Sequence, residues 1–253
     1  MTALPLLLKE LRLPTMSRIW QEFAEQAKIK NWPVEKYLQV LCEHEVAERQ
    51  SRKLSKWMNE AHLPKAKSLE TYDFSFVNSV DKNQIKNWSY GHGWIKEGFN
   101  FLIFGPSGVG KTHLAAAIGE KLIENGFRIL FSRTTELVQK LQAAKRDLEL
   151  PQLLDKLDKY DCLILDDFGY VKKNELETNV LFELICERYE RKSLLLTCNQ
   201  PFKDWDQIFT DKTMAVAAID RLIHHAIILE INEESYRKKE AIARSEKHTK
   251  RKT

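Results

Sequence analysis

The chain has 253 residues, of which 43% are apolar, and 40 Lys and Arg against 36 Asp and Glu give it a net charge of +4. This composition excludes an intrinsically disordered chain, and no apolar run approaches the roughly 20 residues that span a bilayer, which excludes a membrane-spanning protein. We expect a cytoplasmic protein with reduced thiols, because its four cysteines form neither a CxxC motif nor a set with histidine at metal-binding spacing: Cys42, Cys162, Cys186 and Cys198.

Residues 1–66 are predicted to form a small all-helical domain. The leucine run at the N-terminus has no basic residue before it, so a secretory signal peptide is not expected. The segment contains no glycine, and Ile19 and Phe23 share one face at a spacing of four residues. A further helical pattern begins at Pro33 and ends before Pro64, because proline disfavours helical backbone in the residue that precedes it.

The pattern changes after a predicted linker at residues 67–76. Through residues 77–236, short apolar runs alternate with segments of helical length, which is typical of βαβ units and of a parallel sheet covered on both faces. The five predicted strands are residues 101–104, 128–131, 162–165, 194–196 and 226–229. Asn174 and Glu177 have the spacing of a capping box and predict a helix that runs to about Arg191. We therefore predict an α/β fold with a five-stranded parallel sheet, followed by a basic tail at residues 237–253.

A glycine-rich loop follows the first predicted strand and opens the next helix. Its residues match the GxxxxGK[ST] phosphate-binding pattern: Gly105, Pro106, Ser107, Gly108, Val109, Gly110, Lys111 and Thr112. Glycines let backbone N–H groups curl inward toward a phosphate, and the N-terminus of the following helix adds the positive end of its dipole. In this pattern Lys111 reaches the β- and γ-phosphates and Thr112 ligates Mg²⁺. The placement between strand and helix predicts an ATP site, with His113 beside it.

Two carboxylates end the third predicted strand, where parallel sheets bind ligands. Asp166 is suited to position Mg²⁺, and Asp167 to orient or deprotonate an attacking water. A pair of exposed loop acids is the alternative, which the preceding apolar run disfavours. Asn199 follows the fourth strand and is a candidate to hold that water against the γ-phosphate, although an asparagine that opens a turn before Pro201 explains it equally well.

Further residues match one known family in order along the chain. In the second part they are Gly105–Leu114, Leu165–Tyr170, Arg188–Arg191, Asn199–Phe202, Trp205, Asp220–His225 and Ser235–Arg237. In the first part they are Leu8, Leu11, Leu13, Glu43–Glu45, Arg49 and Tyr72–Phe74. On these residues the chain resembles the IstB-like ATP-binding helpers of insertion-sequence transposition, which belong to the DnaA and DnaC branch of AAA+ ATPases. It departs from that family at Asp167, where glutamate is common, and at Cys198, where serine is frequent.

The resemblance implies Mg²⁺-dependent ATP hydrolysis by a homo-oligomer whose ATP sites lie at subunit interfaces. Arg221 is then the arginine finger that reaches the ATP of a neighbouring subunit, where it stabilises charge on the transferring phosphate. Arg237 is then a second nucleotide sensor. An ion pair of Arg221 with Asp220 or another nearby acid is the alternative that the sequence alone favours. The resemblance also implies that the oligomer remodels target duplex DNA and recruits a transposase.

The distribution of charge offers candidate contacts to DNA. Residues 1–70 carry a charge of +3, residues 71–234 carry −5 and residues 235–253 carry +6, a layout that is common where a partner is a polyanion. Candidate phosphate contacts besides the tail are Arg49, Arg52, Lys53, Lys56, Lys140, Lys145, Arg146, Lys172 and Lys173. An ordinary solvated surface explains the same charges. Because no recognition-helix or zinc-finger pattern is present, we expect largely sequence-independent binding.

Two other functions stay open at this stage. A helicase loader or replication-initiation switch of the DnaC type would share the ATP core and differ in the partner of its N-terminal helices. A P-loop kinase of small molecules would act as a monomer with an arginine-bearing lid, and the pair Asp166 and Asp167 together with Arg221 disfavours it. Tyr72 and Phe74, ahead of the phosphate loop, are candidates to stack on adenine or, equally, to pack between domains.

Overall fold

The computed structural model describes residues 3–77, 79–91, 93–169, 174–200, 205, 212–233 and 235–236. The chain forms two compact units, Met1–Trp57 and Met58–Thr253, named here the helical unit and the sheet unit. The division falls inside a long helix rather than in the predicted linker. The reason is that the end of this helix already belongs to the sheet unit, where Ala61 is buried and its carbonyl accepts a hydrogen bond from the backbone N–H of Phe131 at 2.8 Å.

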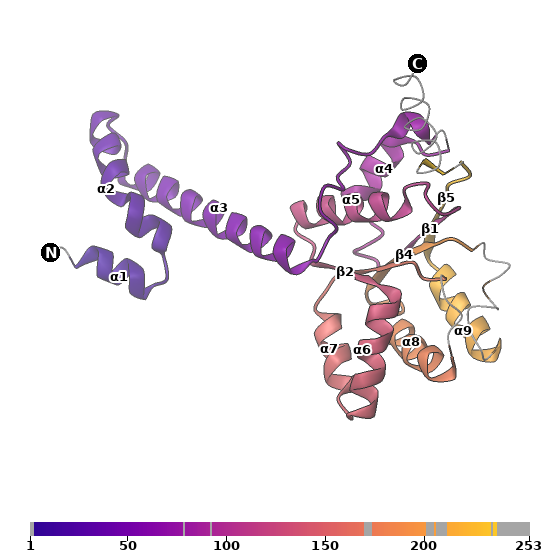
Figure 1. Cartoon of the computed structure of the whole chain (residues 1–253). Helices are drawn as coiled ribbons and strands as arrows, with labels where there is room; N and C mark the ends of the chain where they lie inside the picture. The colour runs from indigo at the N-terminus through magenta and orange to yellow at the C-terminus, as the bar shows by residue number, and fades with distance from the viewer. Residues whose placement is uncertain are drawn as a thin grey trace, which may run out of the picture. The chain divides into compact units, whose positions relative to one another are not determined.

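The helical unit confirms the prediction of an all-helical N-terminal segment. Its helices are α1 (Leu4–Glu10), α2 (Pro14–Ile29) and α3 (Val34–Glu60), the last of which continues into the sheet unit (Figure 1). Glu45 of α3 is buried and accepts hydrogen bonds from the backbone N–H groups of Thr15 and Met16, at 2.8 and 3.1 Å. These donors lie in the first turn of α2 and have no partner within their own helix. Glu45 therefore caps α2 from a neighbouring helix.

The sheet unit contains the predicted five-stranded parallel sheet. Its strands are β1 (Asn100–Phe104), β2 (Ile129–Arg133), β3 (Cys162–Asp166), β4 (Ser193–Cys198) and β5 (Ala226–Glu230). Their order in space is β2-β3-β4-β1-β5, all parallel. The central strands β1, β3 and β4 are buried at every residue, whereas β2 and β5 lie at the edges and are partly exposed. The apolar runs thus mark the strands that are covered on both faces.

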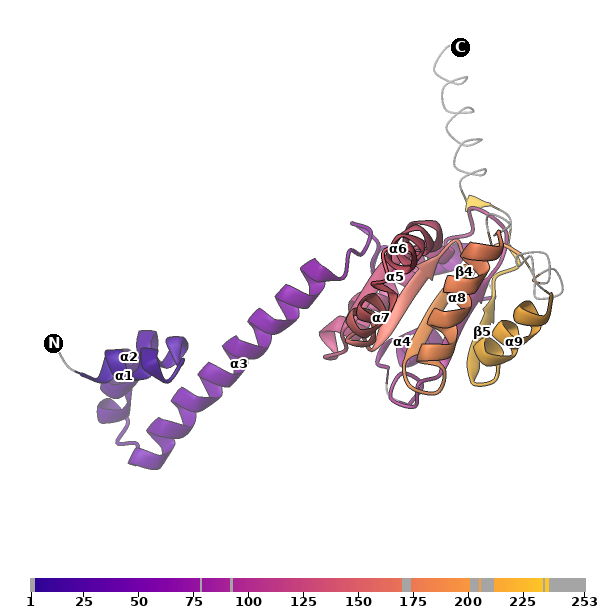
Figure 2. The ribbon, with the colours of Figure 1, turned by 90° about the horizontal axis from the view of Figure 1, so that it is seen from below.

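Helices cover both faces of this sheet. They are α4 (Lys82–Ser89), α5 (Lys111–Glu124), α6 (Thr134–Arg146), α7 (Leu150–Asp158), α8 (Glu175–Arg188) and α9 (Lys212–Ile223). Helices α4 and α5 lie on one face and α6 to α9 on the other (Figure 1); seen from below, α8 lies between α6 and α9 (Figure 2). Among the described residues, no helix combines the length and the apolar character that a bilayer crossing requires.

The start of α8 confirms the predicted capping box, but its end is earlier than predicted. The Asn174 side chain accepts from the backbone N–H of Glu177, and the Glu177 carboxylate accepts from the backbone N–H of Asn174, both at 2.9 Å. The helix ends at Arg188 rather than near Arg191, because Glu190 takes a left-handed backbone with φ of 55°. A left-handed residue cannot continue a right-handed helix.

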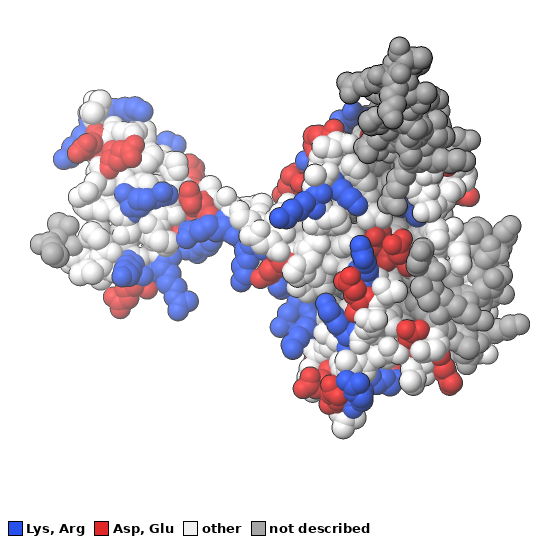
Figure 3. Space-filling view, viewed as in Figure 1, with Lys and Arg blue, Asp and Glu red and all other residues white. Residues whose placement is uncertain are grey.

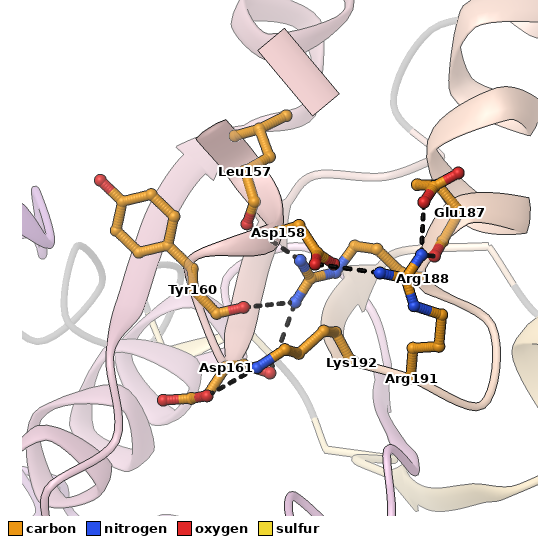
Figure 4. Close-up of polar contacts among 8 residues, drawn as sticks. All are labelled: Leu157, Asp158, Tyr160, Asp161, Glu187, Arg188, Arg191 and Lys192. Carbon is orange, nitrogen blue, oxygen red and sulfur yellow. Dashed lines mark hydrogen bonds and ion pairs between the residues drawn. The ribbon is translucent and has the colours of Figure 1, made fainter. Parts of the chain in front are cut away.

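Arg188 fixes this end of α8 from the inside. Its side chain is buried, and the guanidinium donates to the carbonyl oxygens of Leu157 and Tyr160 at 3.1 and 3.0 Å and to that of Asp161 at 3.4 Å (Figure 4). It also donates to the Ser193 carbonyl at 3.0 Å. These carbonyls end helix α7, lead into β3 and begin β4. Burial lowers the pKa of Arg188 to about 10, so the group stays charged at neutral pH. One arginine thus ties three elements of the sheet unit together.

Candidate nucleotide-binding site

The glycine-rich loop between β1 and α5 is folded tightly against the segment that follows β5. Gly105 and Gly108 have φ of 149° and 86°, values that side chains disfavour. A Cβ atom on Gly105 would lie 2.4 Å from the carbonyl oxygen of Ile231, and one on Gly108 would lie 2.2 Å from the Ser235 hydroxyl. The loop therefore requires glycine at these positions both for its backbone angles and for space.

Lys111 is the first residue of α5 and is directed into this loop. Its side chain is buried, and its ammonium donates to the carbonyl oxygens of Gly105 and Pro106 at 2.7 and 2.8 Å. Two carbonyl dipoles thus hold the charge beside the loop and at the N-terminus of a helix. An anion that enters the loop would find this cation and the helix dipole already in place.

Asp166, at the end of β3, is the centre of a buried hydrogen-bond network. Its carboxylate is 4% exposed and accepts from the hydroxyls of Thr112, at 2.8 Å, and Thr197, at 2.6 Å. Its backbone carbonyl accepts from the Thr134 hydroxyl at 2.8 Å. The Thr112 hydroxyl and the Asp166 carboxylate are close enough to serve together as ligands of Mg²⁺, which prefers oxygen ligands. The structure thus brings together the two residues predicted to hold the metal.

Thr197 is a functional candidate that the sequence reasoning did not identify. Besides its bond to Asp166, its hydroxyl accepts from the backbone N–H of Asp167 at 3.0 Å, and its carbonyl accepts from the backbone N–H of Phe168 at 2.8 Å. It fixes the turn after β3, where Asp167 has a left-handed φ of 57°. The available signal was a hydroxyl directly after the apolar run Leu194–Leu196, which an ordinary core threonine would also give.

The exposed side chains of Asp167 and Asn199 lie close to the loop. Strand β4 lies between β1 and β3, so Asn199 at its end comes between the glycine-rich loop and the end of β3. Both residues border one cavity with Lys111 and Thr112. The site therefore places a carboxylate and an amide beside the groups that suit a phosphate and a metal ion.

This cavity has a volume of about 570 Å³, within the range of small-molecule sites. Its lining residues are Lys67, Thr71, Tyr72, Asp73, Phe76, Val77, Ser107, Gly108, Val109, Gly110, Lys111, Thr112, His113, Asp167, Asn199 and Tyr236. Of the two aromatic candidates, Tyr72 borders the cavity, while Phe74 is not among the lining residues and packs edge-to-face on Tyr72 with ring centroids 4.8 Å apart. Phe76 and Tyr236, which the sequence reasoning did not propose, border the cavity with rings 5.0 Å apart. Aromatic faces of this kind are typical of pockets for planar ligands.

His113 anchors the predicted linker to α5. Its Nε2 lies 3.0 Å from the Ser68 carbonyl and 3.1 Å from the Thr71 hydroxyl, and its ring packs edge-to-face on Tyr72. Burial lowers the pKa of His113 and raises that of Tyr72. A neutral imidazole is therefore part of the cavity wall, and residues 67–77 form one side of the site rather than a loose connection.

Arg221 lies outside this cavity. It is on α9, where its guanidinium donates to the Ala217 carbonyl at 2.8 Å and lies over the rings of Phe182 and Tyr189, at 5.5 and 5.9 Å from their centroids. The alternative of an ion pair with Asp220 is not seen, because no described carboxylate is in ion-pairing distance of Arg221. Arg237 lies outside the described residues.

The candidate phosphate contacts of the helical unit differ in their surroundings. Arg49 and Arg52 lie 3.3 and 3.7 Å from Glu45, in the network that caps α2. Burial raises the pKa of Glu45, but hydrogen bonds from Met16 and Thr15 and the arginine charge outweigh it, so the net pKa is lowered. Lys53 lies over the ring of Trp57 at 4.3 Å. Arg49 and Arg52 thus have a structural role that the charge pattern did not predict.

The candidates of the sheet unit are distributed among acidic groups. Lys140 is exposed, Lys145 pairs with Glu183 at 2.5 Å, and Arg146 contacts Asp147 at 3.2 Å. On the face drawn in Figure 3, basic and acidic side chains are mixed rather than gathered into one basic field. The candidates Lys172 and Lys173 and the tail at residues 237–253 lie outside the described residues.

Comparison with known proteins finds one family over nearly the whole chain. A family model described as "IstB-like ATP binding protein" matches residues 6–244. A putative insertion sequence ATP-binding protein of Sinorhizobium fredii (y4iQ/y4nD/y4sD) is 53% identical over 239 residues, which cover 94% of this chain and 80% of that protein. The insertion sequence IS21 putative ATP-binding protein of Pseudomonas aeruginosa is 36% identical over 240 residues, which cover 95% and 90%.

Solved structures share the fold over about two thirds of this chain. The DnaC helicase loader superposes with a TM-score of 0.54 at 22% identity, over 66% of this chain and 97% of that chain. AMPPCP-bound DnaA from Aquifex aeolicus superposes with a TM-score of 0.54 at 20% identity, over 67% and 51%. These likenesses confirm the predicted P-loop AAA+ fold.

Proposed function

Because this chain belongs to the IstB-like ATP-binding protein family, we propose that it is a Mg²⁺-dependent ATPase that oligomerises on target duplex DNA, remodels it and recruits a transposase during insertion-sequence transposition. The observation that carries the ATPase part is the buried network of Thr112, Asp166 and Thr197 beside a cavity of about 570 Å³. The transposition part is supported by the insertion-sequence ATP-binding proteins that align with this chain over most of their length.

Phosphate binding is the role of the glycine-rich loop and Lys111. The ammonium already lies within 2.8 Å of two loop carbonyls, so a phosphate that enters the loop meets a fixed cation. Thr112 and Asp166 would hold Mg²⁺, which when bound neutralises charge on the phosphates. Thr197, on β4, positions Asp166 for this task, since its hydroxyl donates a hydrogen bond to the Asp166 carboxylate.

Orientation of the attacking water is the role of Asp167 and Asn199. Both side chains are exposed to the cavity that Lys111 and Thr112 border. A carboxylate accepts a proton and an amide donates a hydrogen bond, which together fix and activate a water molecule. Asp167 is one methylene shorter than glutamate, so the turn that Thr197 fixes sets how far its carboxylate reaches.

We expect an oligomer because the negative charge on the transferring phosphate needs a cation that a neighbouring subunit can supply. Arg221 lies on α9 outside its own cavity, so we assign it to the cavity of a neighbouring subunit. An arginine finger contributes about 10³–10⁵ in rate, which makes hydrolysis dependent on assembly. Arg237 is proposed as a second sensor of the same nucleotide.

Phosphate contacts to duplex DNA are assigned to the basic side chains that do not form part of the Glu45 network. In the described chain these include Lys53, Lys56 and Lys140. Such contacts position a protein on DNA without reading its sequence, and they release counterions. Binding should therefore weaken steeply as salt is raised, and a flat salt dependence would count against this assignment.

The test is ATP binding, ATP hydrolysis and sedimentation of the full chain, with and without duplex DNA. We expect Lys111→Ala to lose nucleotide binding. Arg221→Ala should keep nucleotide binding and lose at least about 10³-fold in hydrolysis. A mixture of Arg221→Ala with Asp167→Asn should regain activity, because each variant supplies the intact half of a shared interface.

Two results would overturn the proposal. A monomer with the same specific rate at every protein concentration would exclude the shared interface and favour a small-molecule kinase. Binding of a replicative helicase in place of the transposase would favour a helicase loader, which would share the ATP core. Lys140→Gln serves as a matched control, since this exposed side chain is outside the cavity and should leave hydrolysis without DNA unchanged.

A further inference from the structure

A cluster of metal-ligand side chains lies on the sheet unit, outside the nucleotide cavity. Its members are Glu190, in the turn after α8, and His224 and His225, in the turn between α9 and β5. One ligand atom from each of the three lies within 4.8 Å of the others, which makes them the only such group among the described residues. All three are accessible to solvent, so an ion can enter. Nothing in the proposed ATPase uses this cluster.

The distances in the cluster are close to those of a metal site. Glu190 Oε1 lies 3.8 Å from His224 Nδ1 and 3.7 Å from His225 Nε2. A tetrahedral ion with bonds of about 2.1 Å separates its ligands by about 3.4 Å, so Glu190 and His225 need a shift of only a few tenths of an ångström, and His224 offers a ring nitrogen within 4.8 Å of both other ligand atoms. Two imidazoles and one carboxylate are also the ligand set of zinc sites that keep one open position.

The turn that carries Glu190 is held in position by its neighbours. Arg188 anchors the preceding helix end (Figure 4), and the backbone N–H groups of Arg191 and Lys192 donate to the Arg188 carbonyl at 3.0 and 2.9 Å. A Cβ on Gly98 would lie 3.1 Å from the backbone of Glu190, so the turn packs directly on that glycine. Packing thus holds Glu190 in a left-handed backbone conformation that glutamate by itself disfavours.

The two imidazoles are also held by their surroundings. The ring of His225 stacks on Phe99 with centroids 4.9 Å apart, and the His225 carbonyl accepts from the backbone N–H of Asn100 at the start of β1. His224 Nδ1 lies 2.6 Å from the Tyr189 hydroxyl. A His224 ring whose Nδ1–H donates to this hydroxyl has its lone pair on Nε2, where it is free for an ion. Fixed ring orientation and a free lone pair are what a metal ligand requires.

We infer that Glu190, His224 and His225 bind a divalent transition-metal ion of the zinc class. Imidazole and carboxylate together suit Zn²⁺ better than Mg²⁺, which prefers oxygen ligands alone. The ion would join the turn after α8 to the turn after α9, three residues from Arg221. The inference does not depend on the proposed ATPase, because the cluster shares no residue with the nucleotide cavity.

The test is titration of the untagged, chelator-treated full chain with Zn²⁺ alone, followed by calorimetry. All proteins carry Cys42→Ser, which removes an exposed thiol that binds zinc independently. We expect one Zn²⁺ per chain at this site, and affinity at least about 10-fold weaker in each of Glu190→Gln, His224→Gln and His225→Gln. His44→Gln, at an exposed histidine of α3, is the matched control and should bind as the parent does.

A second readout guards against a variant that binds poorly because it is misfolded. Co²⁺ in place of Zn²⁺ should give the visible absorption of a four-coordinate ion in the parent and not in the three variants, while far-ultraviolet circular dichroism without metal stays the same. Equal Zn²⁺ affinity and equal Co²⁺ spectra in the parent and the variants would overturn the inference and leave the cluster as an ion pair of histidine with glutamate.

Discussion

The helical unit and the sheet unit are stabilised in different ways. In the described part of the helical unit, the buried apolar residues are Met16, Val40 and Leu41, while large apolar side chains such as Leu6 and Leu11 are exposed. The sheet unit buries three whole strands and most of α5. Apolar burial therefore contributes most of the stability of the sheet unit, to which a few buried polar groups add, whereas the helical unit depends mainly on a small number of polar contacts.

One carboxylate in each unit shows the difference. Glu45 and Asp166 are 3% and 4% exposed, and each accepts several hydrogen bonds. The donors to Glu45 are backbone N–H groups and arginines, which no ligand can replace without unfolding α2. The donors to Asp166 are threonine hydroxyls, one of which borders the cavity. A buried carboxylate thus serves structure in one unit and is poised for a ligand in the other.

The largest effect that tests this comparison is expected at Arg188, the polar centre of the sheet unit. Arg188→Met leaves four carbonyl oxygens without their charged donor, and we expect the free energy of unfolding of the sheet unit to fall by about 3–5 kcal/mol. Urea denaturation measures it. Arg146→Met, at an exposed arginine, should change it by less than about 0.5 kcal/mol. Equal effects for the two would mean that apolar burial alone holds this unit.

Asp166→Asn is expected to separate ligand chemistry from structure. The amide oxygen can still accept one threonine hydroxyl, so folding should change little, but the charge that would hold Mg²⁺ is gone. We expect hydrolysis to fall by at least about 100-fold, or roughly 2.7 kcal/mol in activation free energy. Initial rates over a range of Mg²⁺ concentrations measure it. A normal rate with normal Mg²⁺ dependence would contradict the assignment of Asp166.

Glu45→Gln is expected to destabilise the helical unit by about 2 kcal/mol, since it replaces charged acceptor bonds by neutral ones. Hydrogen exchange at the Thr15 and Met16 amides measures it, and Glu43→Gln on the exposed side of α3 is the control. The pKa of Glu45 is lowered by folding, so its contribution is present above the unfolded pKa and is lost as pH falls through the lower folded pKa. Protection should therefore fall in acid for the parent and not for Glu45→Gln.

The smallest effect is expected from a pair of tyrosines, one in each unit. Among the described residues the buried Tyr72 hydroxyl has no hydrogen-bond partner, whereas that of Tyr37 donates to the Trp20 carbonyl at 2.9 Å. Tyr72→Phe should leave the free energy of unfolding unchanged or raise it by less than about 1 kcal/mol, and Tyr37→Phe should lower it by about 1 kcal/mol. Thermal denaturation without nucleotide compares them. The reverse order would contradict the polar dependence of the helical unit.

Features that are local in sequence could be predicted from sequence. The apolar runs predicted the strands, the glycine-rich pattern predicted a tight loop between β1 and α5, and the spacing of Asn174 and Glu177 predicted the start of α8. Each of these depends on residues that are close together along the chain. The end of α8 was misplaced because Arg188 turns inward to carbonyls about 30 residues away, which its position in the helical pattern does not indicate.

Features that need distant residues could not be predicted. Thr197 contacts Asp166 from another strand, and Phe76 and Tyr236 meet in the cavity wall although 160 residues separate them. In the same way, the basic stripe of α3 gave no sign that Arg49 and Arg52 flank a buried acid from the same helix, because that burial depends on α2. Sequence showed which groups were present, and the sheet order decided which of them meet.

The segment after β5 has a consequence for the shape of the cavity. The backbone N–H of Ile231 donates to the Phe104 carbonyl at 2.9 Å, and that of Tyr236 donates to the Gly108 carbonyl at 3.1 Å. The glycine-rich loop is thus joined to a segment far along the chain by backbone hydrogen bonds that no side-chain substitution removes. A change that displaces Ile231 or Tyr236 should therefore displace the loop as well, although neither residue belongs to the loop itself.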